Sequence, residues 1–500
     1  MTLETLSARH ARYRTEDVAL VFGAERLTHA ELDARANRAA NALRGLGLVA
    51  GDRVGLLLDN SVELLELYVA AMKSGVVVVP LSPLLRSEGL LNLLRDAGVA
   101  ALVAAERLAG EVDAVRDRLG LPDERILFAD GSYRALVDAA QATPPPAPRL
   151  SRDHPYDIVY SSGTTGEPKG IVHTHGIREA YGTGFASSFR VHPESVVVHA
   201  GSLVFNGAFV LLMPALYLGC TYVLLPAFDA ESMVEAFARE RATHAIMVPS
   251  QIVALLQRDD FDQEHLPHLE ALCSVGAPLL LEHKQELIRR LPGRLYELYG
   301  LTEGLITILD RDDAERKTGS VGVPPPLYEL RVVGEDGADL PPREVGEIVG
   351  RGPITMPGYH ERPDLTAQAL VDGWLRSGDL GYVDEDGFLY LVDRKKDLVI
   401  SGGVNVYPRD IEEVVVRHPD VLDAAVFGAP DARWGESPIA AVRLRPETAV
   451  AADELRDWIN ERVQARYQRV REVVVRDEFP LSVAGKTLRR VIRDEYLGET

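Results

Sequence analysis

The chain has 500 residues, of which 46% are hydrophobic and 26% charged, and its formal net charge is −21. This composition is that of an ordinary globular protein, and the length is enough for about three folding units. The acidic balance, together with the lack of a long basic run, excludes nucleic acid as an expected partner.

The first half of the chain alternates between segments typical of helices and of buried strands. Thr28 and Glu31 form a capping-box pattern, which predicts a helix that begins after residue 28. Further elements are expected as follows: strands at 54–58 and 76–80, a helix at 62–72, a proline-rich connector at 141–148, and strands at 196–200, 222–225, 245–248 and 271–275. Two blocks of alternating strands and helices predict parallel sheets covered by helices.

The uncharged stretch 202–228 is long enough to raise the question of a membrane span. Leu218-Gly219 resembles a helix end followed by a strand, so a buried helix and strand is the preferred interpretation. Cys220 and Cys273 lie in apolar sequence, and the first residues lack the apolar core of a signal peptide. We therefore expect a cytoplasmic protein with two reduced, buried thiols and no membrane span.

Short strands and turns replace the alternation after residue 319, and they predict a small β-barrel. An αβ segment with helices near 409–417 and 452–464 ends the chain. The expected fold class is α/β with the following parts: a large N-terminal domain at 1–393, made of two parallel-type α/β sheet subdomains (about 1–150 and 151–318) and a small β-barrel subdomain (319–393); a hinge at 394–396; and a small, mobile α+β C-terminal domain at 397–500.

The segment 160–170 carries the densest chemical signal. It reads Tyr-Ser-Ser-Gly-Thr-Thr-Gly-Glu-Pro-Lys-Gly, with four serine and threonine hydroxyls, three glycines and one lysine. Glycines allow successive backbone N–H groups to face one anion, and the hydroxyls and Lys169 add donors and a positive charge. The proline before the lysine separates it from a Walker P-loop. The segment predicts a polyphosphate site, and the alternative is a flexible surface turn.

The segment 299–303 reads Tyr-Gly-Leu-Thr-Glu and offers three further groups for a nucleotide. Tyr299 supplies a flat face for a base, Thr302 a hydroxyl for phosphate, and Glu303 a hard oxygen ligand for Mg²⁺. Taken alone the pattern is weak, because a glutamate after a turn is commonly a solvated cap.

Three more glycine-containing turns carry candidate groups. Asp379 follows Gly378, and its carboxylate can accept from both hydroxyls of a ribose, although an ordinary turn aspartate is the alternative. Gly402-Gly403 leaves room for backbone to approach a narrow ligand, and Lys486 follows Gly485 close to the C-terminus.

The order of these segments, with the charge run 393–397, closely resembles that of the acyl-adenylate-forming (AMP-binding) enzymes, of the acyl- or aryl-CoA ligase type. The resemblance extends from about residue 28 to about residue 493. It implies an acid–thiol ligase that uses ATP, Mg²⁺ and coenzyme A. A carboxylic acid and ATP would give acyl-AMP and pyrophosphate, and a thiol would then displace AMP. Between the two steps the C-terminal domain would rotate about Lys396.

The resemblance also implies a role for each motif residue. The implied catalytic residues are Lys486, Glu303, Thr164 and Lys396, with Glu303 as the metal ligand. The implied cofactor-binding residues are Ser161, Ser162, Gly163, Thr165, Gly166, Lys169, Gly276, Ala277, Pro278, Tyr299, Gly300, Thr302, Asp379, Arg394, Gly402 and Gly403. Lys486 would bridge the substrate carboxylate and the α-phosphate, where a cation stabilises the charge that develops in the transition state.

The acyl pocket is expected between four stretches, 204–209, 248–252, 274–276 and 301–306. Its named residues are Phe205, Asn206, Gly207, Val275, Leu301 and Ile306. The stretches hold one acid, Glu303, and no arginine or lysine, so an apolar monocarboxylate, aryl or medium-chain, is expected and a dicarboxylate would find no cation. Family members that adenylate amino acids commonly have an aspartate where Asn206 stands, so an α-amino acid is disfavoured.

The chain departs from the family pattern at two places. No histidine occurs in the stretch around Asn206, and Gln468 follows Tyr467 where the family usually has a lysine. Two alternatives to a CoA ligase are kept: a stand-alone adenylation enzyme that loads a carrier-protein phosphopantetheine, and a nucleotide-binding protein without ligase activity. The oligomeric state is left open, with a homodimer as one alternative.

Overall fold

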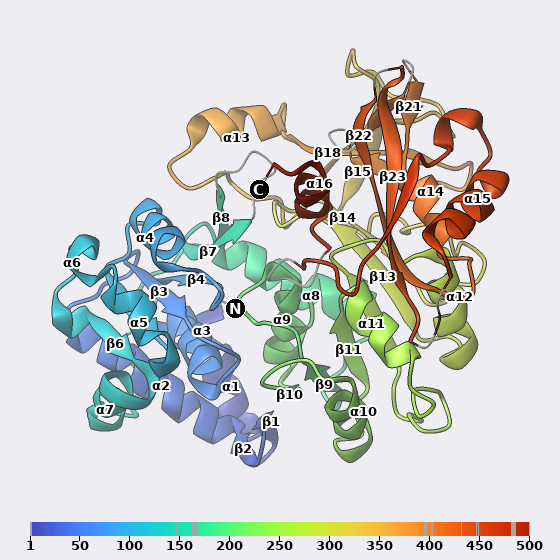
Figure 1. The fold of residues 1–500 in the computed structure, drawn as a ribbon. Helices are drawn as coiled ribbons and strands as arrows, with labels where there is room; N and C mark the ends of the chain where they lie inside the picture. Colours follow the sequence, from blue (N-terminus) through green and yellow to red (C-terminus); the bar gives the residue numbers. More distant parts are fainter. Residues whose placement is uncertain are drawn as a thin grey trace.

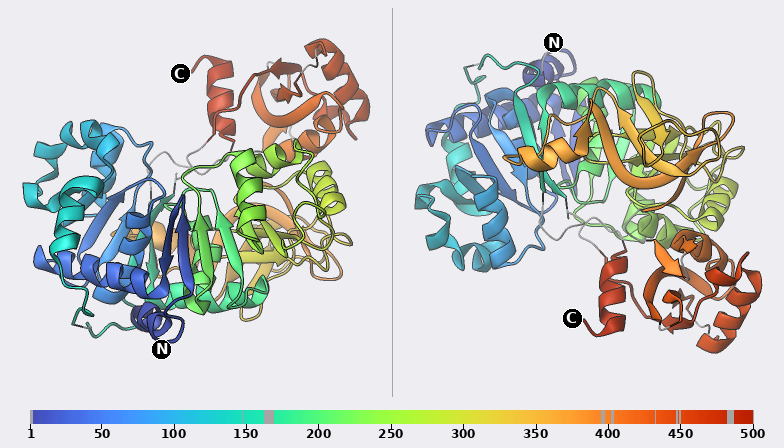
Figure 2. Two further views of the ribbon diagram at one scale, coloured as in Figure 1. Left: turned by 90° about the horizontal axis from the view of Figure 1, so that it is seen from below. Right: turned by 90° about the horizontal axis from the view of Figure 1, so that it is seen from above.

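The computed structural model describes residues 3–146, 148–161, 169–394, 398–401, 404–431, 433–446, 448, 450–481 and 487–499. Two large sheets and a smaller one form the body, and a fourth sheet lies in a separate C-terminal lobe (Figure 1). In the two views of Figure 2 the C-terminal lobe, drawn in red, projects from one side of the body. The predicted α/β class with a separate C-terminal unit is confirmed.

The first sheet has six strands in the order β6-β5-β3-β4-β7-β8, parallel except for the last pair. Its strands are β3 (Arg53–Leu57), β4 (Val77–Pro80), β5 (Ala101–Ala104), β6 (Ile126–Phe128), β7 (Pro155–Ser161) and β8 (Lys169–Thr174). The helices of this part are α2 (His29–Gly45), α3 (Val62–Ser74), α4 (Ser87–Asp96), α5 (Ala109–Asp113), α6 (Arg116–Leu119) and α7 (Arg134–Ala139). The predicted capping box is present, since the Thr28 hydroxyl accepts from the Glu31 N–H and the Glu31 carboxylate accepts from the Thr28 N–H.

The second sheet has eight strands in the order β14-β13-β12-β11-β9-β10-β1-β2. Its strands are β1 (Val18–Phe22), β2 (Glu25–Thr28), β9 (Val196–His199), β10 (Thr221–Leu224), β11 (His244–Met247), β12 (Ala271–Val275), β13 (Leu295–Gly300) and β14 (Ile306–Leu309). Its helices are α1 (Leu6–Tyr13), α8 (His175–Ser188), α9 (Phe209–Leu218), α10 (Ala230–Arg239), α11 (Pro249–Leu256) and α12 (Leu281–Arg290).

The two large sheets do not follow the predicted division near residue 150. β1 and β2 pair into the second sheet through β10, and β7 and β8 belong to the first sheet. Periodicity along the chain identifies strands but not their partners, because strand pairing depends on contacts between distant segments. Each large sheet therefore takes strands from both sides of the proline-rich connector.

The stretch 202–228 that raised the membrane question is buried in the body. It forms α9, followed by Gly219 in the left-handed conformation and then β10, as predicted. The described residues contain no helix long and apolar enough to cross a bilayer. Cys220 and Cys273 are both buried free thiols, which confirms that prediction.

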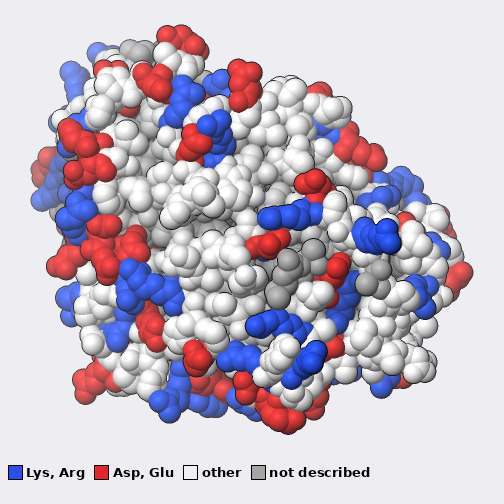
Figure 3. All heavy atoms as spheres, turned by 180° about the vertical axis from the view of Figure 1, so that it is seen from behind, with Lys and Arg blue, Asp and Glu red and all other residues white. Residues whose placement is uncertain are grey.

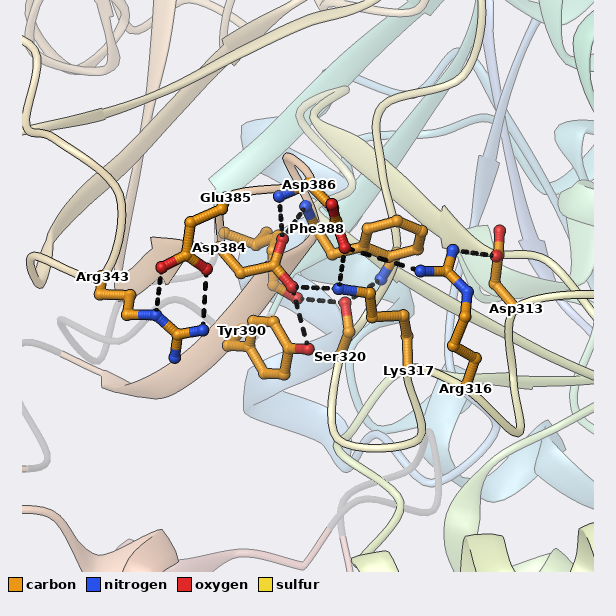
Figure 4. A network of polar contacts seen from close by, with 12 residues as sticks. Asp313, Arg316, Lys317, Ser320, Arg343, Asp384, Glu385, Asp386, Phe388 and Tyr390 are labelled. Atoms are coloured by element: carbon orange, nitrogen blue, oxygen red, sulfur yellow. Dashed lines mark hydrogen bonds and ion pairs between the residues drawn. The ribbon is translucent and has the colours of Figure 1, made fainter.

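The expected small barrel is an open antiparallel sheet, β15-β16-β18-β17, with β19 added on β18. Its elements are β15 (Glu329–Val333), β16 (Gly346–Arg351), α13 (Pro363–Ala369), β17 (Leu370–Val371), β18 (Trp374–Val383) and β19 (Leu389–Arg394). An ionic cluster ties this half-barrel to the loop after β14 (Figure 4). Lys317 Nζ lies 2.6 Å from Asp384 Oδ2 and 2.7 Å from Asp386 Oδ2, over the ring of Phe388.

The C-terminal lobe is built on the sheet β21-β20-β23-β22, with β24 beside β23. Its elements are β20 (Val399–Ser401), β21 (Val404–Val406), α14 (Pro408–Val415), β22 (Val421–Asp431), β23 (Gly435–Leu444), α15 (Ala452–Arg462), β24 (Glu472–Val475) and α16 (Arg489–Leu497). It contacts the body at the start of α12, where Leu280 packs into the lobe's own hydrophobic cluster. There Glu413 Oε2 accepts from the Leu281 N–H at 3.0 Å.

The charged surface of the molecule is mixed in sign. On the face shown in Figure 3, lysine and arginine lie interspersed with aspartate and glutamate around a broad uncharged area. That face therefore carries no continuous basic field of the kind that binds a phosphate backbone.

Candidate active site

The glycine-rich segment connects two antiparallel strands. Ser161 at the end of β7 pairs in register with Lys169 at the start of β8. The predicted residues Ser162, Gly163, Thr164, Thr165 and Gly166 lie outside the described residues, and of Ser161 only the backbone is described. Lys169 Nζ lies 5.3 Å from the ring centroid of Tyr359, a cation–π distance.

Glu303 contacts the same tyrosine through its carboxylate. The Tyr359 hydroxyl donates to Glu303 Oε1 at 2.9 Å, and burial, reinforced by that carboxylate, raises the pKa of Tyr359 well above its usual value. Among the described residues only Oε1 of Glu303 has a hydrogen-bond donor, so Oε2 is available to a cation. A hard carboxylate oxygen suits Mg²⁺, which needs few protein ligands when a polyphosphate supplies the others. The described residues contain no cluster of three or more metal-ligating side chains.

The backbone around Glu303 is fixed from the half-barrel side. The Glu303 carbonyl accepts from the Met356 N–H at 2.8 Å. Gly304 has φ +110°, and a Cβ there would lie 2.1 Å from the Ile354 carbonyl oxygen. Only glycine fits this approach of two backbones.

The residues predicted to hold the nucleoside also converge. β12 and β13 are neighbours with Val275 opposite Leu298, which sets the turn Gly276-Ala277-Pro278 beside Tyr299. The Tyr299 hydroxyl donates to Asp379 Oδ2 at 2.8 Å, and Asp379 is 7% exposed. Asp379 in turn lies opposite Arg394 in the β18–β19 register. Segments from two sheets thus meet at one place, with Gly300 and Thr302 on the chain that links Tyr299 to Glu303.

Most of the residues predicted for the acyl pocket are partly exposed, and two of the predicted lining stretches lie close to each other. Phe205, Asn206, Gly207, Val275 and Leu301 are partly exposed, whereas Ile306 is buried. A Cβ on Gly207 would lie 3.8 Å from Val275 Cγ1, so the start of α9 stands across from the end of β12.

A buried ionic cluster next to Asn206 was not predicted from the sequence. Arg178 in α8 is fully buried, and its Nε and Nη2 lie 2.8 and 2.7 Å from Asp157 Oδ2 on β7. Its Nη1 donates to Asn206 Oδ1 at 2.9 Å. The four lining stretches hold no arginine or lysine, but α8 brings the buried Arg178, paired with Asp157, into contact with Asn206.

The cluster reaches the loop that carries Glu303 through His173 on β8. His173 Nδ1 lies 2.7 Å from Asp157 Oδ1, and Nε2 lies 2.9 Å from the Thr302 carbonyl oxygen. A carbonyl only accepts, so Nε2 carries the proton of that hydrogen bond. Burial alone raises the pKa of Asp157, but the charges of Arg178 and His173 outweigh it and hold that pKa below 3.8.

Comparisons with known proteins decide the family. The model of the AMP-binding enzyme matches residues 7–360, and that of the AMP-binding enzyme C-terminal domain matches residues 410–486. The chain belongs to the AMP-binding enzyme family. This confirms the predicted family and the predicted enzyme class, that of the acid–thiol ligases.

Relatives within the AMP-binding family span the whole chain. It is 35% identical over 497 residues to a feruloyl-CoA synthase of Amycolatopsis sp, with 98% of each chain covered. It is 33% identical over 476 residues to a long-chain-fatty-acid–CoA ligase of Mycobacterium tuberculosis, covering 94% of this chain and 93% of that one. The structure of ATP-bound MatB from Rhodopseudomonas palustris superposes with a TM-score of 0.91 at 30% identity and 99% coverage of both chains. ATP, Mg²⁺ and coenzyme A, the predicted cofactors, are those of the family's CoA ligases.

Four of the predicted AMP-binding family positions in the second half of the chain cannot be placed. Lys396, Gly402, Gly403 and Lys486 lie outside the described residues, and of Arg394 only the backbone is described. Conversely, Tyr359, His173 and Arg178 were missed. Tyr359 and Arg178 stand in no recognisable motif, and His173 lies only three residues beyond the glycine-rich segment without any sign of its partner.

Proposed function

We propose that this protein is an ATP-dependent carboxylic acid–CoA ligase for an apolar monocarboxylate, aryl or medium-chain, acting in the cytoplasm. In the first step a carboxylate oxygen attacks the α-phosphorus of ATP, which gives acyl-AMP and releases pyrophosphate. In the second step the thiol sulfur of coenzyme A attacks the acyl carbon, the bond to AMP breaks, and the acyl-CoA thioester and AMP leave.

The observation that carries this proposal is the meeting of four separate segments at one place. Lys169 and Glu303 both contact Tyr359, and Tyr299 is hydrogen-bonded to Asp379 next to the turn at 276–278. A cation, a hard carboxylate, an aromatic face and a buried carboxylate are the groups that bind phosphates, Mg²⁺, a base and a ribose. ATP would supply the activated phosphorus, and Mg²⁺ would neutralise the charge of its phosphates.

The chain's own residues then take distinct tasks in the proposal. Lys169, with Thr164 and Thr165, would hold the pyrophosphate that leaves, and Asp379 and Arg394 would orient the ribose. Lys486 would supply the positive charge between the carboxylate and the α-phosphate, because these two anions repel one another in the first step. Residues 394–396 would be the hinge between a 1–393 domain and a mobile 397–500 domain, with Gly402-Gly403 lining the thiol's passage.

The acid is proposed from the lining of the pocket. Phe205, Val275, Leu301 and Ile306 are apolar, and the positive charge of Arg178 is compensated by Asp157 inside the same buried cluster. A second carboxylate on the substrate would therefore meet no uncompensated charge in this part of the site. Relatives named for ferulate and for long-chain fatty acids leave both an aryl and an alkyl acid in play.

The test is a panel of aryl and alkyl monocarboxylic acids, read by pyrophosphate release with ATP alone and by AMP release after coenzyme A is added. We expect release of AMP only when coenzyme A is present with a suitable acid. Lys169→Ala and Glu303→Gln serve as impaired variants, and Lys317→Met, remote from the site, as the matched control. Transfer to a carrier protein's phosphopantetheine but not to coenzyme A would favour the adenylation alternative, and no nucleotide cleavage with any acid would refute the proposal.

A further inference from the structure

Asn206 is the polar side chain among the six named residues of the predicted acyl pocket, and its hydrogen-bond partners fix its orientation. An asparagine amide has one oxygen that accepts and one nitrogen that donates two hydrogens. Arg178 can only donate, and its Nη1 lies 2.9 Å from Asn206 Oδ1. The oxygen therefore faces Arg178, and the nitrogen Nδ2 faces the other way.

One of the two hydrogens on Nδ2 is already used. Asn206 Nδ2 donates to the Tyr181 hydroxyl oxygen at 2.9 Å, and Tyr181 is 2% exposed. Among the described residues the second hydrogen of Nδ2 has no acceptor. Asn206 itself is partly exposed, in the part of the chain predicted to line the acyl pocket. The side chain thus presents one unused N–H group from a position that cannot flip.

Arg178 is itself rigid, which makes this orientation permanent. Its guanidinium is bonded to Asp157, lies 3.9 Å from the Phe209 ring centroid and 4.8 Å from that of Tyr181, and has no contact with solvent. A planar guanidinium held by a carboxylate and two aromatic rings has no alternative rotamer to adopt without leaving Asp157 buried and uncompensated.

We propose that Arg178 acts as a positioning residue that turns Asn206 into a hydrogen-bond donor of the acyl pocket. The enzyme would then prefer acids that carry a hydrogen-bond acceptor, such as an ether, hydroxyl or carbonyl oxygen, over plain hydrocarbon acids of the same shape. This inference rests on the proposed ligase function and narrows its substrate class. An unfilled N–H in a half-buried site discriminates against a methylene, since the methylene displaces water from the donor without replacing its hydrogen bond.

The experiment uses pairs of acids that differ only by an oxygen in place of a methylene. An aryl series compares methoxy- with ethyl-substituted benzoic and cinnamic acids at the ortho, meta and para positions. An alkyl series compares alkoxypropanoic acids with alkanoic acids of equal length. The readout is the ratio of kcat/KM, oxygen-bearing acid over hydrocarbon acid, in the coenzyme A-dependent assay. In the wild type we expect a ratio of about ten for at least one position, the size of one hydrogen bond.

Two variants at one position separate donor from shape. Asn206→Leu removes the donor, so the ratio should fall to about one. Asn206→Asp keeps the size and the contact with Arg178 but offers only acceptors, so its ratio should fall below one. Arg178→Lys keeps a cation beside Asp157 without the planar fork, and the ratio should fall while melting temperature reports its folding.

The outcomes separate this inference from the function on which it rests. Turnover of both acids of every pair at equal kcat/KM in the wild type would overturn the donor site and leave the ligase intact. A ratio that stays high in Asn206→Leu would do the same. No turnover of any acid would instead refute the ligase and the inference with it.

Discussion

The cluster around Asp157 and the cluster around Lys317 both pair a basic side chain with aspartate, but they differ in how far water reaches their charged groups. In the first, Asp157 and Arg178 are both fully buried and the contacts join the two large sheets to the pocket. In the second, the side chain of Lys317 is 13% exposed and pairs with Asp384, 5% exposed, and with Asp386, 61% exposed. These contacts join the half-barrel to the body (Figure 4).

Burial decides how much each cluster can contribute and what its loss would cost. Water screens the outer Lys317–Asp386 pair, and the more buried Asp384 keeps three other hydrogen-bond donors if Lys317 is removed. The inner charges cannot be hydrated by water, so loss of one partner leaves the other charge unpaired in a medium of low dielectric. The inner cluster is therefore suited to fixing positions, as it does for Asn206 and Thr302, whereas the outer one is suited to a replaceable contact.

The largest difference between buried and exposed groups should appear in acid. Burial lowers to about 4 the pKa of five histidines in the body: His29, His175, His199, His244 and His283. Below their ordinary pKa of 6.5 the unfolded chain binds protons that the folded chain does not, so stability falls as pH drops from 6.5 to 4. Each histidine contributes a slope of up to about 1.4 kcal/mol per pH unit.

Urea unfolding of the full chain between pH 7.5 and 4 measures this loss. The outer cluster should contribute little until the pH approaches the ordinary aspartate pKa of about 3.9. Burial raises the pKa of Asp384, but the hydrogen bonds it accepts, that from Lys317 first, together outweigh burial and hold that pKa below its usual value, so its contribution is lost only in stronger acid. The pKa of Lys317 is raised by its hydrogen bonds to Asp384 and Asp386, so its contribution is complete below about 10.5 and is lost only at higher pH. A stability that stays constant down to pH 4 would contradict the buried, neutral histidines.

The next largest effect is expected at the inner pair. Asp157→Asn should leave the guanidinium of Arg178 buried without compensation and lower the free energy of unfolding by about 3–5 kcal/mol. Adding Arg178→Met removes the stranded charge, so the double variant should be less impaired than the sum of the single ones. Denaturant titrations of the three variants form the cycle, and additive losses would show that the two groups do not interact.

A smaller effect, on activity, is expected at Tyr359, whose hydroxyl donates to Glu303, and the outer cluster offers a matched tyrosine–carboxylate pair for comparison. Tyr359→Phe removes the donor to Glu303 and should raise the Mg²⁺ concentration for half-maximal adenylation about threefold to tenfold. Tyr390→Phe makes the same change at Asp384 in the outer cluster, where the hydroxyl lies 3.3 Å away, and serves as control. Equal Mg²⁺ dependence in both variants would separate Tyr359 from the metal site.

The smallest effect is expected at Lys317. Lys317→Met keeps the length of the side chain and removes its charge, and the melting temperature should fall by about 2 °C or less. Calorimetry at low and high salt is the measurement. A loss as large as that of Asp157→Asn would show that screening does not separate the two clusters.

The sequence predicted the elements better than their partners. The capping box at Thr28 and the helix and strand after Phe209 follow from local patterns and were correct. The pairing of β1 with β10 joins segments about two hundred residues apart, which no local pattern encodes. The order of the motifs predicted one common site for Tyr299, Asp379, Lys169 and Glu303, because residues with a role toward a ligand have characteristic neighbours in sequence. In the structure Tyr299 contacts Asp379, and Lys169 and Glu303 both contact Tyr359.

Residues that act on other residues were the ones missed. Arg178 stands on an ordinary helix, and its significance comes from Asp157 and Asn206, which lie 21 and 28 positions away. Tyr359 contacts Glu303 from 56 positions away and belongs to the half-barrel side. An arginine inside the apolar face of α8 was the one available signal, since a charge at such a position requires a buried partner.

Gly304 determines how closely the loop that carries Glu303 is coupled to the half-barrel. Because two backbones touch there with no side chain between them, the loop and the segment at 354–356 have nothing compliant to absorb a relative shift. A side chain would deform through its rotamers, whereas peptide planes are stiff. A displacement of the segment at 354–356 would therefore shift the backbone at Glu303 with it, and the same holds in the reverse direction.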